Sequence, residues 1–328
     1  MVEKINITFL GTGSAIPTAR RNHPATLLKY KAENILVDCG EGTQRQFRKA
    51  HLNPCKVTKI LISHWHGDHV LGLPGLLQTL NLNGYQGELV IYGPGGSKKA
   101  FQEMVAPYLG FYWDVNRKNA GNFNIVLKEV PPQNKEKDGL GQTLGAGIIF
   151  DSDEFYIEAA EMNHGCPALG YSFVVKEKKR LDKEKLKKLK IPNSPLVGEL
   201  VKGKSVEING KKVDGKKLMY VEPARKVTFI MDTAMNNNAV KLAKDSDVLI
   251  SEATHSVEEQ EIATKYGHLT SVDAATIAKK AKVKALVLIH LSQRYEAIPK
   301  VILGEAEEVL KGTKIPVRVV EDFDGLEL

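Results

Sequence analysis

The sequence predicts an α/β sandwich, because segments with the pattern of strands and segments with the pattern of helices alternate twice along the chain. Between the two alternating regions, residues 123–175 are rich in strand formers and contain glycine and proline turns. We expect this stretch to be antiparallel and to link two α/β halves. No segment repeats at a fixed period.

Each expected element follows from a short apolar run or from a helical pattern. In the first third, apolar runs between turn residues predict strands over residues 5–10, 35–37 and 60–62. A segment rich in Gln and Arg predicts a helix over residues 42–49. The second half repeats the alternation, with strands expected over residues 227–231, 248–251 and 285–289 and helices over 239–244, 272–280 and 302–311.

The composition is that of a folded protein with a sizeable core. A chain of 328 residues has the length of about two domains, and 42% hydrophobic with 26% charged residues excludes general disorder. The three cysteines are odd in number and form no Cys-x-x-Cys pair, so neither a disulfide framework nor a cysteine zinc site is supported. No secretion signal and no membrane-spanning window is found, so we expect a cytoplasmic protein with no membrane contact.

The positive charge is concentrated in one segment. The whole chain carries +7, whereas residues 176–217 hold 15 basic and 6 acidic side chains, a local +9 that leaves −2 for the remainder. The pattern there predicts one short amphipathic helix, a turn containing proline and a hairpin around Asn209-Gly210. Two interpretations stay open on these residues alone: a solvated excursion without function, or a protruding basic arm that grips phosphates.

A cluster of histidines directly follows the strand expected at residues 60–62. The run Ser63-His64-Trp65-His66-Gly67-Asp68-His69 places three imidazoles and one carboxylate within six residues, although the whole chain has only 9 histidines. A turn at a strand end can direct such side chains to one point, and imidazole with carboxylate suits Zn²⁺, or less selectively Mn²⁺, Fe²⁺ or Co²⁺. A metal site is therefore expected here.

Further ligands are expected from other strand ends, because four ligands from one loop cannot close around an ion and leave a position for the reaction. A pair of metals is consistent with this need. His164, Asp232 and His290 each stand at the carboxyl end of an expected strand, where open α/β sheets place their sites. Taken singly, Asp232 is equally well explained as a capping residue, and the two histidines as partly buried side chains.

With these motifs the chain resembles the metallo-β-lactamase superfamily and, within it, the ribonuclease Z family. The resemblance covers nearly the whole length. Besides the histidine run and the three further residues, it rests on Gly11-Thr12-Gly13-Ser14, Pro17-Thr18, Arg21-Asn22, Asp38-Cys39-Gly40-Glu41-Gly42, Thr43-Gln44-Arg45-Gln46, Leu71-Gly72-Leu73-Pro74-Gly75-Leu76, Met231-Asp232-Thr233 and His290-Leu291-Ser292-Gln293-Arg294-Tyr295.

The resemblance implies a metallo-β-lactamase αβ/βα four-layer sandwich. Residues 1–175 and 220–328 would form one catalytic domain, interrupted by a flexible tRNA-binding arm at residues 176–219. It also implies two Zn²⁺ per subunit, with Mn²⁺ or another divalent metal as alternatives. One metal would be held by His64, His66 and His164. The other would be held by Asp68, His69 and His290. Asp232 would bridge the two metals.

The same resemblance assigns a proton donor and its partner. His268, in the run Gly267-His268-Leu269-Thr270-Ser271, would donate the proton, and Glu252 would orient it. The structural alternatives are that Glu252 is only a polar strand-end residue and that Thr270 or Ser271 is a helix N-cap. Three histidines have no assigned role and are expected at the surface or in loops: His23, His51 and His255.

The implied activity is removal of the 3′ trailer from precursor tRNA, leaving a tRNA 3′-hydroxyl and a trailer with a 5′-phosphate. Asp68 would help to position or deprotonate a metal-activated water, and His268 would protonate the departing oxygen. The arm would hold the tRNA elbow, although Ser194-Pro195 stands where the family usually has Gly-Pro. A homodimer, in which one subunit's arm serves the other's active site, is implied as well, and no DNA partner is expected.

Two other classes of function remain open on the sequence. A metal-dependent hydrolase of small phosphodiesters or thioesters would share these ligands without needing a basic arm. A metal-free RNA-binding protein on the same scaffold would tolerate loss of the ligands, but all seven are present here.

Overall fold

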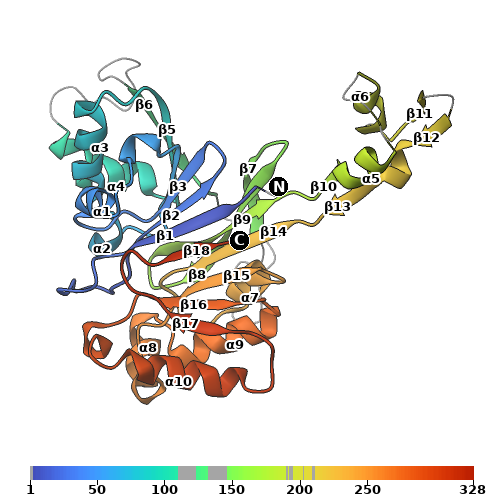
Figure 1. The fold of residues 1–328 in the computed structure, drawn as a ribbon. Helices are drawn as coiled ribbons and strands as arrows, with labels where there is room; N and C mark the ends of the chain where they lie inside the picture. The colour runs from blue at the N-terminus through green and yellow to red at the C-terminus, as the bar shows by residue number, and fades with distance from the viewer. Residues whose placement is uncertain are drawn as a thin grey trace.

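Two seven-stranded sheets face each other in the computed structural model, which describes residues 3–109, 123–131, 146–189, 191, 195–201, 203–208 and 211–328. The first sheet has the strand order β18-β1-β2-β3-β4-β5-β6, and the second has the order β17-β16-β15-β14-β9-β8-β7. Helices pack on the outer face of each sheet, so the layers run helix, sheet, sheet, helix (Figure 1). The four-layer sandwich predicted from the sequence is confirmed.

The first sheet comes from the N-terminal part of the chain and is completed by the last strand. Its strands are β1 (Ile5–Gly11), β2 (Ala25–Tyr30), β3 (Glu33–Val37), β4 (Lys59–Leu61), β5 (Gly87–Gly93), β6 (Phe123–Glu129) and β18 (Gly325–Glu327). Strands β18 to β3 pair antiparallel and strands β3 to β6 pair parallel. The expectation of an antiparallel stretch from residue 123 onward is therefore wrong for β6, which follows a helical crossover and so returns parallel to β5.

The second sheet mixes an antiparallel and a parallel part. Its strands are β7 (Ala146–Asp151), β8 (Phe155–Asn163), β9 (Pro167–Val175), β14 (Arg225–Ile230), β15 (Val248–Glu252), β16 (Leu286–Ile289) and β17 (Val317–Val319). Strands β7, β8, β9 and β14 pair antiparallel, as expected for this region, and strands β14 to β17 pair parallel.

Helices occupy the two outer layers and the loops near one sheet edge. On the first sheet lie α1 (Thr43–Lys49), α3 (Leu73–Leu82) and α4 (Ser97–Met104), and on the second α7 (Asn237–Ala243), α9 (Ser271–Ala281) and α10 (Pro299–Leu310). Two short helices, α2 (Gly67–Val70) and α8 (Gln260–Tyr266), lie in loops that carry site residues. Thr270 is the N-cap of helix α9, and its side chain forms a capping box with Asp273. The N-cap role expected as an alternative for Thr270 is thus present.

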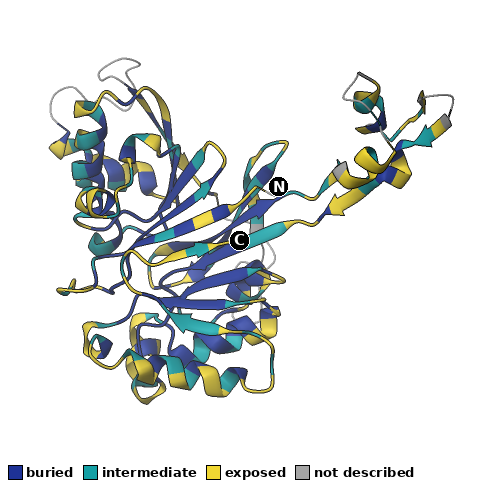
Figure 2. Cartoon of the chain, viewed as in Figure 1, coloured by how far each residue is buried: buried dark blue, intermediate teal, exposed yellow. Residues whose placement is uncertain are grey.

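The main core lies between the sheets, where Figure 2 shows a buried interior. Strand β14 illustrates how the sequence builds it. Val227 and Phe229 face the opposite sheet, and Ile230 faces the helices, because successive strand side chains point to opposite faces. Both faces of this strand are therefore buried, as in strands covered on two sides.

The basic segment projects from the body on a two-stranded stalk (Figure 1). The stalk consists of β10 (Lys178–Leu181) and β13 (Met219–Glu222), and beyond it lie α5 (Lys183–Lys188), α6 (Pro195–Val201), β11 (Ser205–Ile208) and β12 (Lys211–Asp214). Leu200 and Leu218 are buried among neighbouring side chains, which gives the segment a small core of its own. The segment has a second short helix, because Pro195 begins α6 rather than making a turn. Ser194 and Asn209-Gly210 lie outside the described residues, although β11 and β12 pair antiparallel as the hairpin predicts.

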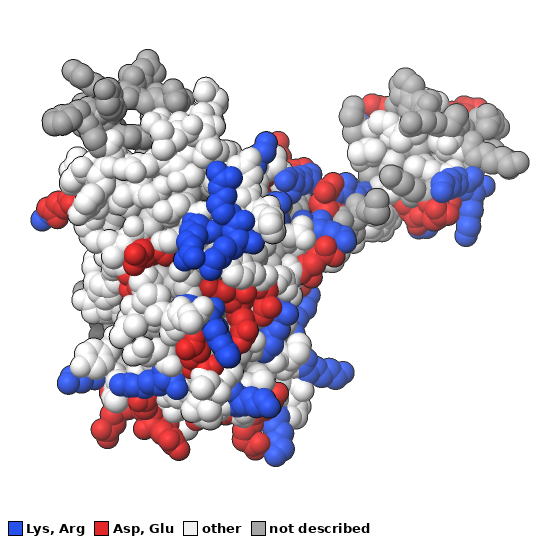
Figure 3. Space-filling model, turned by 60° about the vertical axis from the view of Figure 1, so that its left-hand side comes forward, with Lys and Arg blue, Asp and Glu red and all other residues white. Residues whose placement is uncertain are grey.

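Ion pairs connect the stalk to the body. The Glu154 carboxylate is 2.8 Å from Nζ of Lys178 and 2.5 Å from Nζ of Lys31, and Arg180 pairs with Glu222 across the stalk. Figure 3 shows basic and acidic side chains next to one another where the arm leaves the body. Among the described residues, no helix is both long and apolar enough to span a bilayer.

Candidate metal centre

The seven expected metal ligands come together at one edge of the two sheets. Each follows the carboxyl end of a strand, or lies in the first turn after it, so the topology alone directs them to one place. His64, His66, Asp68 and His69 follow β4, His164 follows β8, Asp232 follows β14, and His290 follows β16. Their side chains form overlapping groups whose ligand atoms lie within 4.8 Å of one another.

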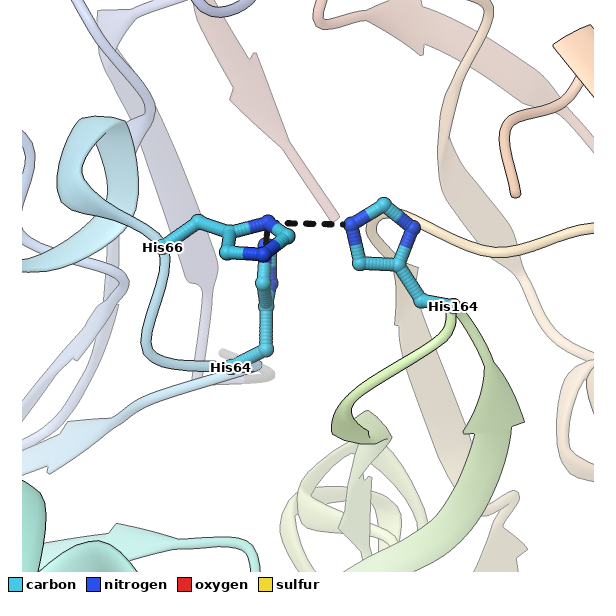
Figure 4. A group of neighbouring side chains, drawn as sticks. All are labelled: His64, His66 and His164. Carbon is cyan, nitrogen blue, oxygen red and sulfur yellow. Dashed lines mark hydrogen bonds between the residues drawn. The ribbon is translucent and has the colours of Figure 1, made fainter. Parts of the chain in front are cut away.

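One group consists of three imidazoles. Nδ1 of His66 lies 3.0 Å from Nε2 of His64 and 3.1 Å from Nε2 of His164, as Figure 4 shows. The three nitrogens thus point at one small volume. Burial and the nearby His69 ring hold the pKa of His64 well below its ordinary value, so this ring is neutral, as metal ligation requires.

A second group lies on the other side of Asp232. Oδ2 of Asp68 is 3.3 Å from Nε2 of His69 and 3.5 Å from Nε2 of His290. Two imidazole nitrogens and one carboxylate oxygen therefore converge there.

Asp232 stands between the two groups and turns one oxygen to each. Its Oδ2 lies 3.7 Å from Nε2 of His64 and 3.6 Å from Nε2 of His164, whereas its Oδ1 lies 3.5 Å from Nε2 of His69. Although burial favours its protonated form, the His290 and His69 rings hold the pKa of Asp232 well below its ordinary value. An ionised carboxylate with two separately directed oxygens has the arrangement needed to bridge two cations.

The polar atoms of this cluster fit a cation. Nε2 of His69, Nε2 of His290 and Oδ1 of Asp232 are buried and have no hydrogen-bond partner among the described residues. Buried polar atoms in proteins are nearly always bonded, so three such atoms in one cluster fit the binding of a cation there. Imidazole and carboxylate donors without sulfur suit Zn²⁺ and related divalent metals.

Groups behind the ligands fix the orientation of the rings. Asp38 is fully buried, and its Oδ2 is 2.8 Å from Nδ1 of His69. It also accepts hydrogen bonds from the backbone N–H and the hydroxyl of Ser63. A carboxylate in this position directs the other ring nitrogen of His69 toward the cluster. The sequence contained Asp38 only as part of a motif and gave it no role.

Two further supports act in the same way. Nδ1 of His164 lies 2.7 Å from the carbonyl oxygen of Gly267, and Nδ1 of His290 lies 2.9 Å from the hydroxyl of Thr254. In both rings Nε2 is then left for the cluster. Neither partner was expected from the sequence. A backbone carbonyl can belong to any residue type, and Thr254 stands in a polar run that has no recognisable motif.

His268 and Glu252 form a pair at the rim of the cluster. Nδ1 of His268 is 3.2 Å from Oε2 of Glu252, which is fully buried and also accepts bonds from the Thr233 backbone and the Thr254 hydroxyl. Burial works against a charged imidazole here, but the Glu252 carboxylate outweighs it and raises the pKa of His268 to about 9. The ring thus carries a proton at neutral pH, next to Asp232 at 3.8 Å.

Two of the histidines that were expected at the surface or in loops lie in loops but are buried. His23 and His255 are both only 6% exposed. His23 packs against the backbone of the first loop, with Nε2 3.2 Å from the carbonyl oxygen of Ala15, and His255 pairs with Glu259. His51 is exposed, as expected.

The two facing sheets, with a His/Asp cluster where strands of both sheets end, define a protein of the metallo-β-lactamase fold. The metallo-β-lactamase fold protein YhfI of Bacillus subtilis superposes over 100% of both chains with a TM-score of 0.67 at 17% identity. The short form of human tRNase Z covers 98% of both chains with a TM-score of 0.65 at 29% identity.

Sequence comparison then gives the family. Ribonuclease Z of Haloferax volcanii is 35% identical over 324 residues, which are 98% of this chain and 94% of that protein. Ribonuclease Z of Enterococcus faecalis is 36% identical over 332 residues, with 99% and 97% covered. The chain belongs to the ribonuclease Z family. A family model described as Anti-Pycsar protein Apyc1 also matches, over residues 5–96 only.

Proposed function

We propose that this protein is a zinc-dependent endoribonuclease that removes the 3′ trailer from precursor tRNA, leaving a tRNA 3′-hydroxyl and a trailer with a 5′-phosphate. The observation that carries the proposal is the position of Asp232 between two ligand triads, each facing one of its carboxylate oxygens. Membership of the ribonuclease Z family and the likeness to human tRNase Z support tRNA as the substrate.

In this proposal the cluster would hold two Zn²⁺ ions, or Mn²⁺ in their place, with Asp232 shared by the two ligand sets. His64, His66 and His164 would hold one ion, and Asp68, His69 and His290 the other. When bound, such ions activate water as a nucleophile and neutralise charge on the attacked phosphate.

The chain's own residues supply the proton transfers. Asp68 is only partly buried, so it can accept the proton of the attacking water while also serving as a ligand. His268 lies on the rim with a raised pKa and can give its proton to the departing 3′ oxygen. Glu252 holds the ring of His268 in place through Nδ1. Because water attacks and no 2′ oxygen takes part, the trailer keeps the phosphate.

The basic arm supplies affinity for the tRNA in this proposal. Residues 176–219 carry the positive excess of the chain and stand clear of the catalytic residues 1–175 and 220–328 (Figure 1). Lysine side chains that contact phosphates bind without regard to nucleotide sequence, and their affinity falls as the salt concentration rises.

We also propose that the protein is a cytoplasmic homodimer in which each arm serves the partner's site. Light scattering on the purified protein tests the dimer.

The substitution Asp68→Ala tests the catalytic part of the proposal. It removes one ligand and the proposed proton acceptor, and we expect loss of precursor cleavage with the dissociation constant for precursor tRNA unchanged within about twofold, since phosphate contacts by the arm dominate binding. Asp153→Ala, an exposed carboxylate far from the cluster in sequence, is the matched control and should cleave normally. Normal cleavage by the Asp68 variant would exclude the proposed role.

A further inference from the structure

A pocket of about 370 Å³ opens beside the metal centre, and the proposed mechanism does not use most of it. His66, His164 and His268 are among its lining residues. The lining also includes exposed apolar side chains, Tyr266 at 60% and Ile16 at 54% exposure. A pocket lined both by the reacting groups and by an exposed ring has room for a nucleotide next to the scissile phosphate.

His255 lines the same pocket and is held by a carboxylate outside the metal cluster. Its Nδ1 lies 2.9 Å from Oε2 of Glu259. Glu259 is itself fixed, because it accepts hydrogen bonds from the guanidinium of Arg294 at 2.7 Å and from the hydroxyl of Tyr295 at 2.5 Å. The orientation of the His255 ring is therefore set before any substrate binds.

This arrangement decides which ring nitrogen of His255 can meet a ligand. A carboxylate only accepts hydrogen bonds, so Nδ1 of His255 carries the proton shared with Glu259. In the neutral ring Nε2 is then an acceptor. In the described part of the chain no protein group is bonded to this nitrogen.

The position of His255 relative to His268 suggests what Nε2 accepts. The centroids of the two rings are 6.0 Å apart. In a ribose whose 3′ oxygen lies against His268, the 2′-hydroxyl is on the adjacent carbon, within reach of a second imidazole at this separation. That hydroxyl can donate a hydrogen bond, and it is the group by which proteins distinguish RNA from DNA.

We propose that Nε2 of His255 accepts a hydrogen bond from the 2′-hydroxyl of the nucleotide on the 5′ side of the cut, so that the enzyme selects ribose over deoxyribose at this one position. The inference rests on the proposed function, because it takes His268 as the proton donor to the 3′ oxygen of the same nucleotide. No bond other than this hydrogen bond forms or breaks at His255.

The test compares precursor tRNAs that differ only at that nucleotide, which carries ribose, 2′-deoxyribose or 2′-fluororibose. For each enzyme, kcat/KM on the ribose substrate is divided by kcat/KM on each analogue, so a general loss of activity in a variant cancels. We expect this ratio to be about three- to tenfold larger for wild type than for His255→Phe, which corresponds to one hydrogen bond between neutral groups. His255→Gln retains an acceptor and should recover part of the ratio.

Equal ratios in wild type and His255→Phe would overturn the inference, while leaving precursor cleavage itself in place. Failure of wild type to cleave the all-ribose precursor would instead contradict the proposed function. A binding measurement separates the two cases further. Fluorescence anisotropy with mature tRNA that ends in this nucleotide should show a preference for terminal ribose over 2′-deoxyribose in wild type, and none in His255→Phe. The absence of a preference in wild type would count against the inference without any turnover.

Discussion

At the scale of single residues, the centre depends as much on the groups behind the ligands as on the ligands. Nδ1 of His69 is bonded to Asp38, that of His164 to the Gly267 carbonyl, and that of His290 to Thr254. Each contact fixes a ring so that Nε2 points inward. The cluster is thus oriented by groups that are not themselves among the seven expected metal ligands.

The substitution Asp38→Asn tests this dependence. Asp38 has a positive φ of 56°, which Asn tolerates, so the backbone should be preserved while the charge and one acceptor are lost. We expect affinity for the metal to fall by about 10- to 100-fold, the usual effect of removing a carboxylate behind a ligating histidine. Competition with a chelator of known affinity measures it.

Asp245→Asn is the matched control, because Asp245 also has a φ of 56° and lies exposed after α7, on the second sheet's outer layer. It should bind metal like wild type. Equal metal affinities of the two variants would show that the Asp38 carboxylate has no influence on the metal centre.

Residues with a chemical pattern could be predicted, and residues defined by distant contacts could not. The spacing of the run from His64 to His69 alone predicts a metal site. His164, Asp232 and His290 are predicted as further ligands because they stand at the ends of expected strands. Asp38 is 31 residues from His69, and its role depends on how β3 and β4 pair. The burial of His255 could not be predicted, because an isolated histidine in a polar run carries no signal of burial.

At the scale of elements, parallel pairing explains why the ligands meet. Strands β14, β15 and β16 run parallel and end together, which puts Asp232, Glu252 and His290 at one edge. Strands β3 and β4 do the same for Asp38 and the histidine run. Each expected strand in these regions matches an observed one within about two residues.

The direction of β6 and the internal structure of the arm were less accessible from sequence. Parallel or antiparallel pairing of β6 is set by the crossover before it, not by its own residues. Residues 195–201 form a helix that packs Leu200 into the small core of the arm. That contact joins residues distant in sequence, so no local sequence pattern predicts it.

The arm can be removed at a defined place, because Leu181 and Met219 are paired across the stalk. Replacing residues 182–218 with an Asn-Gly turn keeps the stalk and deletes the basic tip. We expect KM for precursor tRNA to rise at least about tenfold, and the slope of log affinity against log salt to become shallower, since phosphate contacts are lost.

The matched measurement is hydrolysis of bis(p-nitrophenyl) phosphate, which is too small to reach the arm. Its rate should remain close to that of wild type. Unchanged precursor affinity in the deletion would contradict the role proposed for the arm. Loss of both activities would point instead to damage to the catalytic part.

At the scale of the whole molecule, the end of the chain ties the two halves of the fold together. Asp322 accepts hydrogen bonds from the backbone and hydroxyl of Thr12, from the backbone of Asn22 and from the side chain of Gln46. Asp322, in the acidic stretch at 321–325, therefore holds the first loop of the site. Thr12 and Asp322 are 310 positions apart, so only the folded chain reveals the contact.

Asp322 also predicts a pH dependence of stability. Burial raises its pKa to about 6, although the hydrogen bonds and the Arg21 guanidinium act in the opposite direction. An unfolded aspartate has a pKa of about 3.9, so the folded chain takes up this proton first as the pH falls. Between about pH 6 and pH 4 this group therefore adds stability on acidification, up to about 3 kcal/mol in total.

Urea unfolding of wild type and Asp322→Asn across this range isolates the contribution, since other titrating groups cancel in the difference. The free energy of unfolding of wild type, relative to the variant, should increase from pH 6.5 to pH 4.5. A decrease over the same range would show that the hydrogen bonds outweigh burial and that the pKa of Asp322 is low in the folded protein.

For the molecule as a whole we propose a ribonuclease Z family chain with a dinuclear metal centre that cuts precursor tRNA at its 3′ end. The most direct measurement is cleavage of a precursor tRNA with a 3′ trailer by the purified protein, with chelator and then with added Zn²⁺ or Mn²⁺, mapping both product ends. We expect a metal-dependent cut at the junction of tRNA and trailer, a 3′-hydroxyl on the tRNA and a 5′-phosphate on the trailer. A cut that persists in chelator, or a 2′,3′-cyclic phosphate on the tRNA, would contradict it.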